Sequence, residues 1–210
     1  MTVLFVLDLV GVFAFALSGA WLATRKDFDL VGMLALAFVT GLAGGMVRDV
    51  LVGDVPPLAM DRQVYLVVPV LAAIVVLAAP GLVRRFELPV MILDAIGLGL
   101  FASVGSAKAI ESGLGVWSSM LVGVIAACGG GIIRDLLAGV VPQVFGRRSE
   151  LYAIPAALGA LLVALFWHKT GGSWLLTAAS IGVTLLLRLG SVRYGWHAPG
   201  RPRAEDWPAD

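Results

Sequence analysis

The sequence predicts an all-α integral membrane protein with seven transmembrane helices, six of them forming an inverted repeat of two three-helix units. Of 210 residues, 60% are hydrophobic and 14% charged, whereas soluble domains hold about 45–50% and about 25%. The mean hydropathy of +0.96 agrees with this composition. Seven apolar segments approach the roughly 20 residues that span a bilayer. A shift of 86 residues superposes the first half of the chain on the second.

The seven segments are expected to be helices, because hydrocarbon offers the backbone no other hydrogen-bond partners. The first has no basic region before it and contains Asp8, so we expect it to be retained and not cleaved as a signal peptide. The residues after Ser191 mix prolines with charges and predict a short tail. The expected spans lie at about residues 3–23, 30–52, 64–83, 90–109, 116–139, 151–167 and 173–189.

The repeat is the most specific pattern in the chain. The phrase Gly44-Gly45-Met46-Val47-Arg48-Asp49 recurs as Gly130-Gly131-Ile132-Ile133-Arg134-Asp135. Because a unit of three helices is odd, its second copy enters the membrane upside down. We expect one unit at residues 1–86, a second at 87–172, the seventh helix at 173–190 and a cytoplasmic tail at 191–210. The same shift superposes Asp8 on Asp94, Gly11 on Gly97, Phe15 on Phe101, Gly19 on Gly105 and Pro56 on Pro142.

Basic residues in the loops predict the orientation. The loops after the first, third and fifth spans carry two basic residues each, and the intervening loops carry one each. The positive-inside rule places the richer side in the cytoplasm, so the N-terminus is expected outside and the C-terminus inside. The richer loops contain Arg25, Lys26, Arg84, Arg85, Arg147 and Arg148, against Arg62, Lys108 and Lys169 on the opposite side.

Adjacent glycines interrupt the second and fifth expected spans near their midpoints. Each lowers helix propensity by about 1 kcal/mol, so a kink is expected there, with loosened carbonyls that coordinate cations. The same glycines would also let two helices pack closely, as small residues do in membranes. Both interpretations stay open for Gly44, Gly45, Gly129, Gly130 and Gly131.

Charged side chains stand beside both glycine groups, at depths where lipid makes a charge costly. Asp8 and Arg48 are expected near the outer surface, and Asp94 and Arg134 at the matching inner depth. We therefore expect two ion pairs, Asp8 with Arg48 and Asp94 with Arg134. They either flank a pore and guard its vestibules or only stabilise the bundle.

Five further polar residues are candidates for roles along such a path. Asp49 and Asp135 accept hydrogen bonds when ionised and so attract cations. Ser18 and Thr40 would supply hydroxyl oxygens to a pore. Lys108 ends the fourth span, where it either gates the path or snorkels to the interface.

The sequence argues against an enzyme. The two histidines, His168 and His197, lie at an interface and in the tail, and neither is placed as a buried base. Cys128 is the single cysteine, which excludes an intrachain disulfide and a cysteine metal cluster. We expect no catalytic residue, no cofactor and no tightly bound metal. The net charge of +1 gives no reason to expect nucleic acid as a partner.

Taken together, the two Gly-Gly/Arg-Asp motifs and the Asp94-Ala-Ile-Gly97-Leu-Gly-Leu-Phe101-Ala stretch resemble the prokaryotic branch of the trimeric intracellular cation (TRIC) channels. The resemblance covers about residues 3–190. It implies a homotrimer in a bacterial or archaeal plasma membrane, with a hydrated pore in each protomer for potassium and, less selectively, sodium.

Position by position, the resemblance assigns the kinks to the five glycines and the pore charges to Arg48, Asp49, Arg134 and Asp135. Ala43 stands where the second copy has Gly129, so the first kink is expected to be shallower. The Lys-Glu-Val lipid motif of animal members is absent from the second span, so phosphoinositide regulation is not transferred.

Two functions follow as hypotheses. The leading one is a passive cation channel whose water-filled path lies between the kinked second and fifth spans. The alternative is a secondary transporter of glycine or another small amino acid, because related bacterial sequences are grouped under a glycine-transporter name. Inverted repeats suit both.

Overall fold

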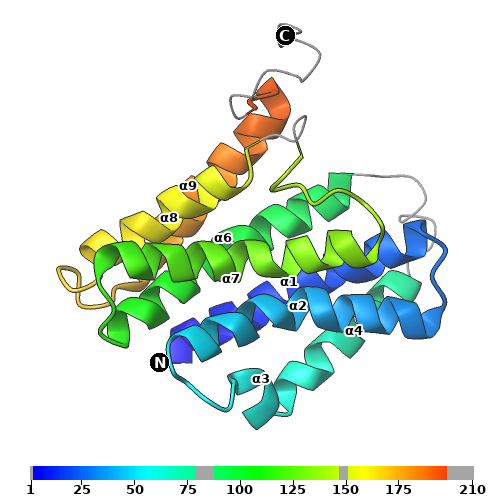
Figure 1. Ribbon diagram of the computed structural model, residues 1–210, viewed down its shortest axis with the longest axis horizontal. Helices are drawn as coiled ribbons and strands as arrows, with labels where there is room; N and C mark the ends of the chain where they lie inside the picture. Colours follow the sequence, from blue (N-terminus) through cyan, green and yellow to red (C-terminus); the bar gives the residue numbers. More distant parts are fainter. Residues whose placement is uncertain (1, 79–87, 147–150, 198–210) are drawn as a thin grey trace, which may run out of the picture.

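The computed structural model describes residues 2–78, 88–146 and 151–197, and every regular element in these ranges is an α-helix (Figure 1). The second, third and fifth expected spans begin at the predicted residues, and the others begin within two residues of prediction. The expected end of the third span, at residue 83, lies outside the described residues. The eight helices in the described ranges are α1 (Thr2–Arg25), α2 (Leu30–Leu51), α3 (Leu58–Asp61), α4 (Val64–Ala78), α6 (Leu88–Glu111), α7 (Val116–Leu137), α8 (Ala153–Phe166) and α9 (Trp174–Tyr194).

Five of these helices, α1, α2, α6, α7 and α9, are long and apolar enough to cross a membrane. In the described ranges α4 has 15 residues and α8 has 14, which at 1.5 Å per residue reach only about 21–23 Å. Both are apolar. The chain is thus an all-helical membrane protein, and the full set of seven spans remains a proposal.

Local sequence sets the helix ends. The side chain of Asp29 caps α2 by accepting from the Gly32 amide at 2.7 Å, which satisfies one of its free N–H groups. Gly195 ends α9 in the left-handed conformation, with φ of 64°, where glycine has no steric penalty. The predicted helix end at residue 190 was therefore too early, since α9 continues to Tyr194. Residues 198–210 of the expected tail lie outside the described residues.

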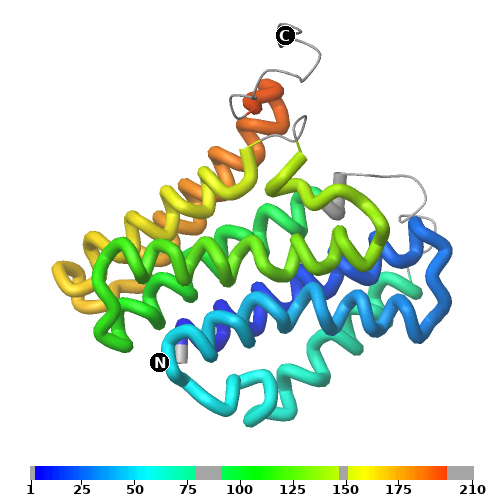
Figure 2. The backbone as a smooth tube through the Cα atoms, viewed as in Figure 1, coloured from blue at the N-terminus to red at the C-terminus, as the bar shows by residue number. Residues whose placement is uncertain are grey.

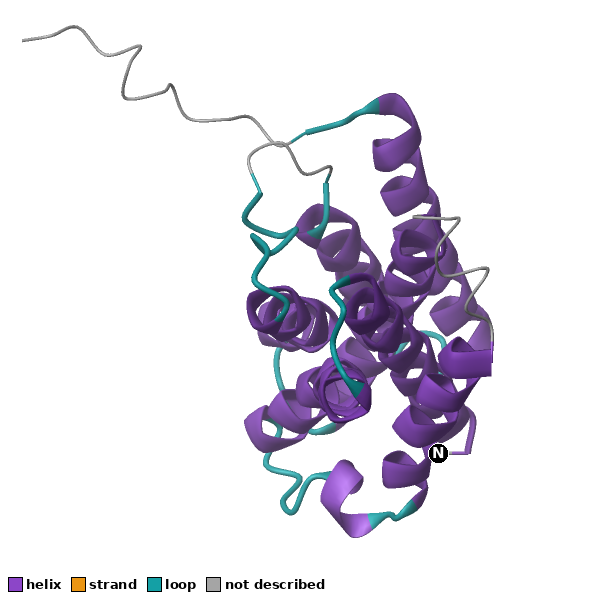
Figure 3. Ribbon diagram, turned by 90° about the vertical axis from the view of Figure 1, so that its right-hand side faces the viewer, coloured by secondary structure: helices purple, strands orange, loops and turns teal. Residues whose placement is uncertain are grey.

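Four helices form the centre of the bundle. Helix α1 packs on α2 and α6, and α7 packs on α2 and α6; Figure 2 shows these four chain segments running side by side. Helix α4 covers α1 and α2, and α8 covers α6 and α7. Helix α9 packs on α6 and α8, so it has no counterpart in the first half. Figure 3, turned by 90°, shows the same helical bundle from the side.

The helical bundle has two ends, the N face and the C face. The N face is the end where α1 begins and where α2 and α6 finish, near Leu4, Asp54 and Glu111. The C face is the opposite end, where α1, α7 and α9 finish. The central helices run between the two faces (Figure 1).

Reciprocal contacts join α1 to α6 at mid-length. A Cβ placed on Gly11 would lie 2.8 Å from the Phe101 ring, and one placed on Gly97 would lie 2.7 Å from the Phe15 ring. Each glycine therefore makes room for the phenylalanine of the other helix. Because Gly11 and Gly97, like Phe15 and Phe101, are 86 positions apart, the two halves of the chain make the same contact twice.

Candidate functional site

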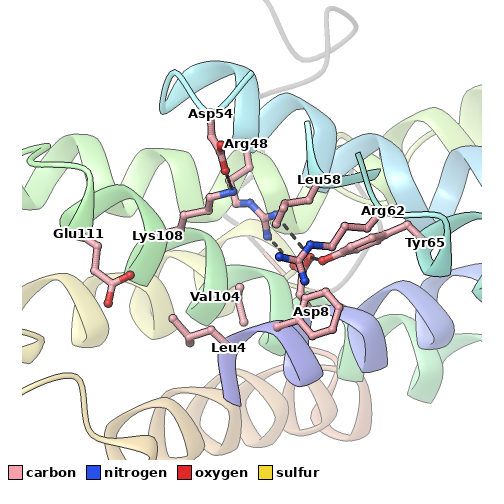
Figure 4. A pocket seen from close by; sticks show the side chains of 11 residues that line it. Leu4, Asp8, Arg48, Asp54, Leu58, Arg62, Tyr65, Val104, Lys108 and Glu111 are labelled. Carbon is pink, nitrogen blue, oxygen red and sulfur yellow. Dashed lines mark hydrogen bonds and ion pairs between the residues drawn. The ribbon is translucent and has the colours of Figure 1, made fainter. Parts of the chain in front are cut away.

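A buried charge cluster lies near the N face. Arg48 donates from Nη1 to Asp8 Oδ1 at 2.5 Å and from Nε to Asp49 Oδ1 at 2.9 Å. The hydroxyl of Tyr65 donates to Asp8 Oδ2 at 2.7 Å. Asp49 also accepts from the backbone N–H of Leu58 at 3.0 Å, which fixes the start of α3. The cluster thus ties α1, α2, α3 and α4 together (Figure 4).

Lys108 extends this cluster toward solvent. Its Nζ lies 2.7 Å from Asp49 Oδ1 and also pairs with Asp54. The lysine side chain is 19% exposed and that of Asp54 is 47% exposed, so this edge of the cluster is open to water. Figure 4 shows Lys108 beside Asp54. Lys108 therefore does more than snorkel to an interface, because it joins α6 to the end of α2.

A second cluster near the C face repeats the first. Arg134 donates from Nη1 to Asp94 Oδ1 at 2.5 Å and from Nε to Asp135 Oδ1 at 2.9 Å. Asp135 accepts from the backbone N–H of Gln143 at 3.1 Å, much as Asp49 accepts from Leu58. Ser18 from α1 accepts from Arg134 Nη1 at 2.9 Å. Both ion pairs expected from the sequence, Asp8–Arg48 and Asp94–Arg134, are therefore present.

The Arg-Asp dipeptide has the same mechanical role in both clusters. The aspartate holds the guanidinium of the arginine before it and fixes the segment that follows the helix, while the arginine reaches a carboxylate on another helix. Two carboxylates around one guanidinium leave each buried triad with one excess negative charge when all three groups are ionised. Charges in such an environment persist only when paired, so the clusters hold their helices in one register.

Asp94→Asn is expected to destabilise the protein by about 1.5–3 kcal/mol, because it replaces the charged hydrogen bond between Arg134 and Asp94 with one to a neutral amide. Thermal denaturation in detergent, followed by size-exclusion chromatography, measures this loss. The matched control is Asp54→Asn, which removes a partly exposed pair with Lys108 and should cost about 1 kcal/mol or less. Equal losses for the two variants would contradict the role given to the buried triad.

The glycines of α2 and α7 mainly serve close packing. A Cβ on Gly44 would lie 2.1 Å from the carbonyl oxygen of Ala126, and one on Gly130 would lie 2.2 Å from the carbonyl oxygen of Thr40. Both helices run as unbroken α-helix through these residues. At this crossing the two backbones are in contact, so it leaves no room for water or an ion. The expectation of a path directly between these two helices is wrong at this level, because the glycines bring the backbones together.

The other three glycines of the motifs differ in what they face. Gly45 faces the Phe101 ring, at 3.3 Å from an added Cβ. Gly131 faces the Tyr152 hydroxyl, at 2.6 Å from an added Cβ. Gly129 has ordinary contact distances, with the Gly44 Cα at 3.5 Å, which explains why its counterpart in the first copy is Ala43.

A phenylalanine pair separates the two charge clusters. The rings of Phe15 and Phe101 lie with centroids 5.3 Å apart, and each residue is 1% exposed. Phe15 follows Asp8 by seven positions on α1, and Phe101 follows Asp94 by seven on α6, a rise of about 10 Å in each case. Since α1 and α6 start at opposite faces, both rings come to lie between the clusters.

The hydroxyls singled out in the sequence have different surroundings. Ser18 belongs to the C-face cluster through Arg134. Thr40 instead donates to Leu36 O at 2.6 Å within its own helix, and it packs against Gly19, where an added Cβ would lie 2.6 Å from its oxygen. The structure therefore brings Ser18, and not Thr40, to a charge cluster.

Both charge clusters are buried, and a cavity adjoins the one at the N face. A cavity of about 450 Å³ opens at the N face and reaches Asp8 and Arg48, with Tyr65 and Lys108 in its wall (Figure 4). At the C face Asp94, Arg134 and Asp135 are all buried, at 0–3% exposed. Tyr152 lies there beside Gly131.

Sequence reasoning missed four residues of this site. No role in the site was predicted for Phe15 and Phe101, which were noted only because the 86-residue shift superposes them. Tyr65 and Tyr152 were not recognised as a pair, because they are 87 positions apart and the shift is 86. An alignment that allowed one inserted residue would have paired them.

Comparisons with known proteins place the chain among membrane proteins. The family model described as "Glycine transporter" matches residues 5–80 and 91–168. A UPF0126 membrane protein of Deinococcus radiodurans is 45% identical over 176 residues, covering 80% of this chain and 82% of the relative. The UPF0126 inner membrane protein YadS of Escherichia coli K12 is 37% identical over 196 residues and 91% of each chain.

Solved structures of membrane channels have a fold similar to that of this chain. The TRIC channel orthologue from Rhodobacter sphaeroides has a TM-score of 0.83 at 31% identity, covering 93% of this chain and 100% of the other. A prokaryotic TRIC channel in 0.5 M KCl has a TM-score of 0.85 at 30% identity, covering 92% and 97%. Another structure, from work on conductance through TRIC cation channels, has a TM-score of 0.83 at 33% identity, covering 94% and 97%. The chain therefore belongs to the family of TRIC channels, which the glycine-transporter model and the UPF0126 membrane proteins also represent.

Proposed function

We propose that this protein is a passive channel for monovalent cations, with potassium preferred over sodium, and that each protomer holds its own path. The observation that carries the proposal is the arrangement of two anionic clusters on either side of the Phe15–Phe101 pair. The similar solved structures are TRIC cation channels. Ion channels are not enzymes, and the proposal needs no cofactor.

Charge supports the choice of cations. When all three groups are ionised, each buried triad of two aspartates and one arginine has one excess negative charge, which attracts cations and repels anions in a medium of low dielectric. At the N face the further pair of Lys108 with Asp54 adds no net charge. The residues Arg48, Asp49, Arg134 and Asp135 thus act as paired sets. The arginines hold the carboxylates in place and do not form free barriers.

The proposed path runs between the α1–α6 pair and the α2–α7 pair, and not through the contact of α2 with α7. It enters through the N-face cavity beside Lys108, passes Asp8 and Arg48, crosses the Phe15–Phe101 pair and leaves past Asp94 and Ser18. Two apposed rings make a hydrophobic constriction, which stops ions when it is dry. In this proposal the structure is the closed state of the channel, and the two rings move apart when the channel opens.

We further propose the architecture that suits this path. The two matched stretches of the family model start at residues 5 and 91, a difference of 86, which supports two inverted units of three spans followed by α9. The N-terminus would lie outside and the C-terminus in the cytoplasm, so the N face is the outer one. The protein would act in the inner membrane as a homotrimer in contact with lipid.

A second candidate is a secondary transporter of glycine or another small amino acid. One observation favours it, the description of the matching family model. In such a carrier the two inverted halves would rock in alternating access.

Transport assays on purified protein separate the two candidates. A channel gives discrete unitary currents in planar bilayers with potassium chloride on both sides. A carrier gives no unitary current but exchanges labelled glycine against unlabelled glycine in liposomes. We expect unitary currents without glycine counterflow, and the opposite pair of results would overturn the proposed channel.

A further inference from the structure

Helix α9 contributes one buried arginine, Arg188, near the C-face end of the proposed path. Arg188 is 1% exposed, and α9 has no counterpart in the repeat. Its guanidinium carbon lies 5.0 Å from the centre of the Tyr152 ring, within the range of a cation–π interaction. A charged side chain buried this deeply is costly unless it makes such contacts.

The same guanidinium fixes both ends of the segment that leads from α7 to α8. Arg188 donates from Nη1 to Leu151 O at 3.1 Å and from Nη2 to Gln143 Oε1. The backbone N–H of Gln143 in turn donates to Asp135 Oδ2 at 3.1 Å. A chain of contacts therefore connects α9 to the Arg-Asp dipeptide of α7.

Tyr152 is the residue on which these contacts of Arg188 act. Its hydroxyl lies beside α7, because a Cβ on Gly131 would come within 2.6 Å of it and within 3.5 Å of Asp94 Oδ1. Tyr152 is 4% exposed and packs in the central hydrophobic cluster together with Cys128. Tyr152 thus lies at the start of α8, beside the stretch of α7 that carries Gly131.

The N face shows what the cluster looks like without α9. There Tyr65 donates to its aspartate, at 2.7 Å from Asp8 Oδ2, and a cavity of about 450 Å³ reaches that carboxylate. Lys108 lines this cavity, and its counterpart at the C face in the 86-residue shift is Leu22. Arg188 thus comes to the C face from a helix outside the repeat.

We propose that Arg188 is the positioning residue of a C-face gate: it holds Tyr152 and Gln143 across the path, and the path opens to that face when this hold is lost. The proposal rests on the proposed function in one respect, namely that the path carries monovalent cations. Arg188 itself touches no transported ion; it acts through Tyr152.

The native Cys128 makes the gate measurable without any ion current. Cys128 packs in the same hydrophobic cluster as Tyr152, and it is the single cysteine of the chain. A positively charged methanethiosulfonate reagent added from one side of the vesicles, with the modified protein quantified by mass spectrometry, reports access to it from that face.

We expect Arg188→Met to raise the modification rate of Cys128 from the C face at least tenfold and to leave the rate from the N face unchanged. Arg188→Lys, which keeps a cation over the Tyr152 ring, should give an intermediate rate. Ser191→Ala is the matched control, since Ser191 also donates to Leu151 O, at 3.3 Å, and its removal leaves the arginine in place.

A second variant keeps the test decisive if Arg188→Met fails to fold. Gly131→Ala pushes the Tyr152 hydroxyl away while Arg188 stays intact, so it should also speed modification from the C face. The inference is overturned if either folded variant reacts at the wild-type rate, or if the rate rises equally from both faces, as general loosening would cause. Because the readout is chemical, failure of the gate and absence of ion conduction are seen separately.

Discussion

Gly130→Ala is expected to reduce the thermal stability of the protein strongly, because the added methyl group forces α2 and α7 apart. The new Cβ would lie 2.2 Å from the carbonyl oxygen of Thr40, and a backbone atom cannot move aside as a flexible side chain can. The two helices must separate, which costs about 1–3 kcal/mol or more. Fluorescence-detected size-exclusion chromatography after heating in detergent measures the shift.

The neighbouring glycine supplies the control for this prediction. Gly129→Ala adds the same methyl group one position earlier, where its nearest neighbour, the Gly44 Cα, lies at 3.5 Å. It should melt close to the wild type. Gly44→Ala, with Ala126 O at 2.1 Å, should behave like Gly130→Ala. If Gly129→Ala and Gly130→Ala lost stability equally, the glycines would act through helix propensity and the close-packing account would be wrong.

The double variant Phe15→Ala, Phe101→Ala is expected to conduct potassium continuously. Removing both rings opens the space between the two anionic clusters. Water then fills the former hydrophobic constriction, and ions can cross it. Liposomes loaded with potassium and containing this variant should lose it many times faster than wild-type liposomes. Each Phe→Ala change also costs about 3–5 kcal/mol in a packed core, so folded protein must be isolated before the flux is compared.

Phe13→Ala is the matched control for the ring pair. Phe13 lies two positions before Phe15 on α1, but it packs against a different hydrophobic cluster that contains Trp21 and Met33. Its loss should lower stability without raising potassium efflux. An unchanged efflux in a folded double variant would mean that the path does not cross the phenylalanine pair.

The sequence alone predicts most of the fold because two patterns are strong. Apolar segments near 20 residues locate the helices, and the hydropathy of those at α4 and α8 is high although the helices described are short. The ion pairs Asp8–Arg48 and Asp94–Arg134 follow from depth, since a charge in lipid requires a partner. Helix α3 was not expected, because its four residues owe their place to Asp49, which binds the backbone of Leu58.

The role of the glycines could not be settled from the sequence. A glycine pair at mid-span permits both a kink and a close approach, and the choice depends on which residue of the partner helix faces it. Gly44 meets the carbonyl of Ala126 and Gly130 meets that of Thr40, contacts that join residues more than 80 positions apart. The contact of Arg188 with Tyr152 could not be predicted either, since nothing near Arg188 in the sequence points to that residue.

The reversal potential of the purified protein in a planar bilayer tests the central claim most directly. The account holds that two triads, each with one excess negative charge, border a path that cations cross. Under a gradient of potassium chloride, unitary currents should therefore reverse near the potassium equilibrium potential. Currents that reverse near the chloride equilibrium potential, or a folded protein that gives no unitary current at any voltage, would contradict it.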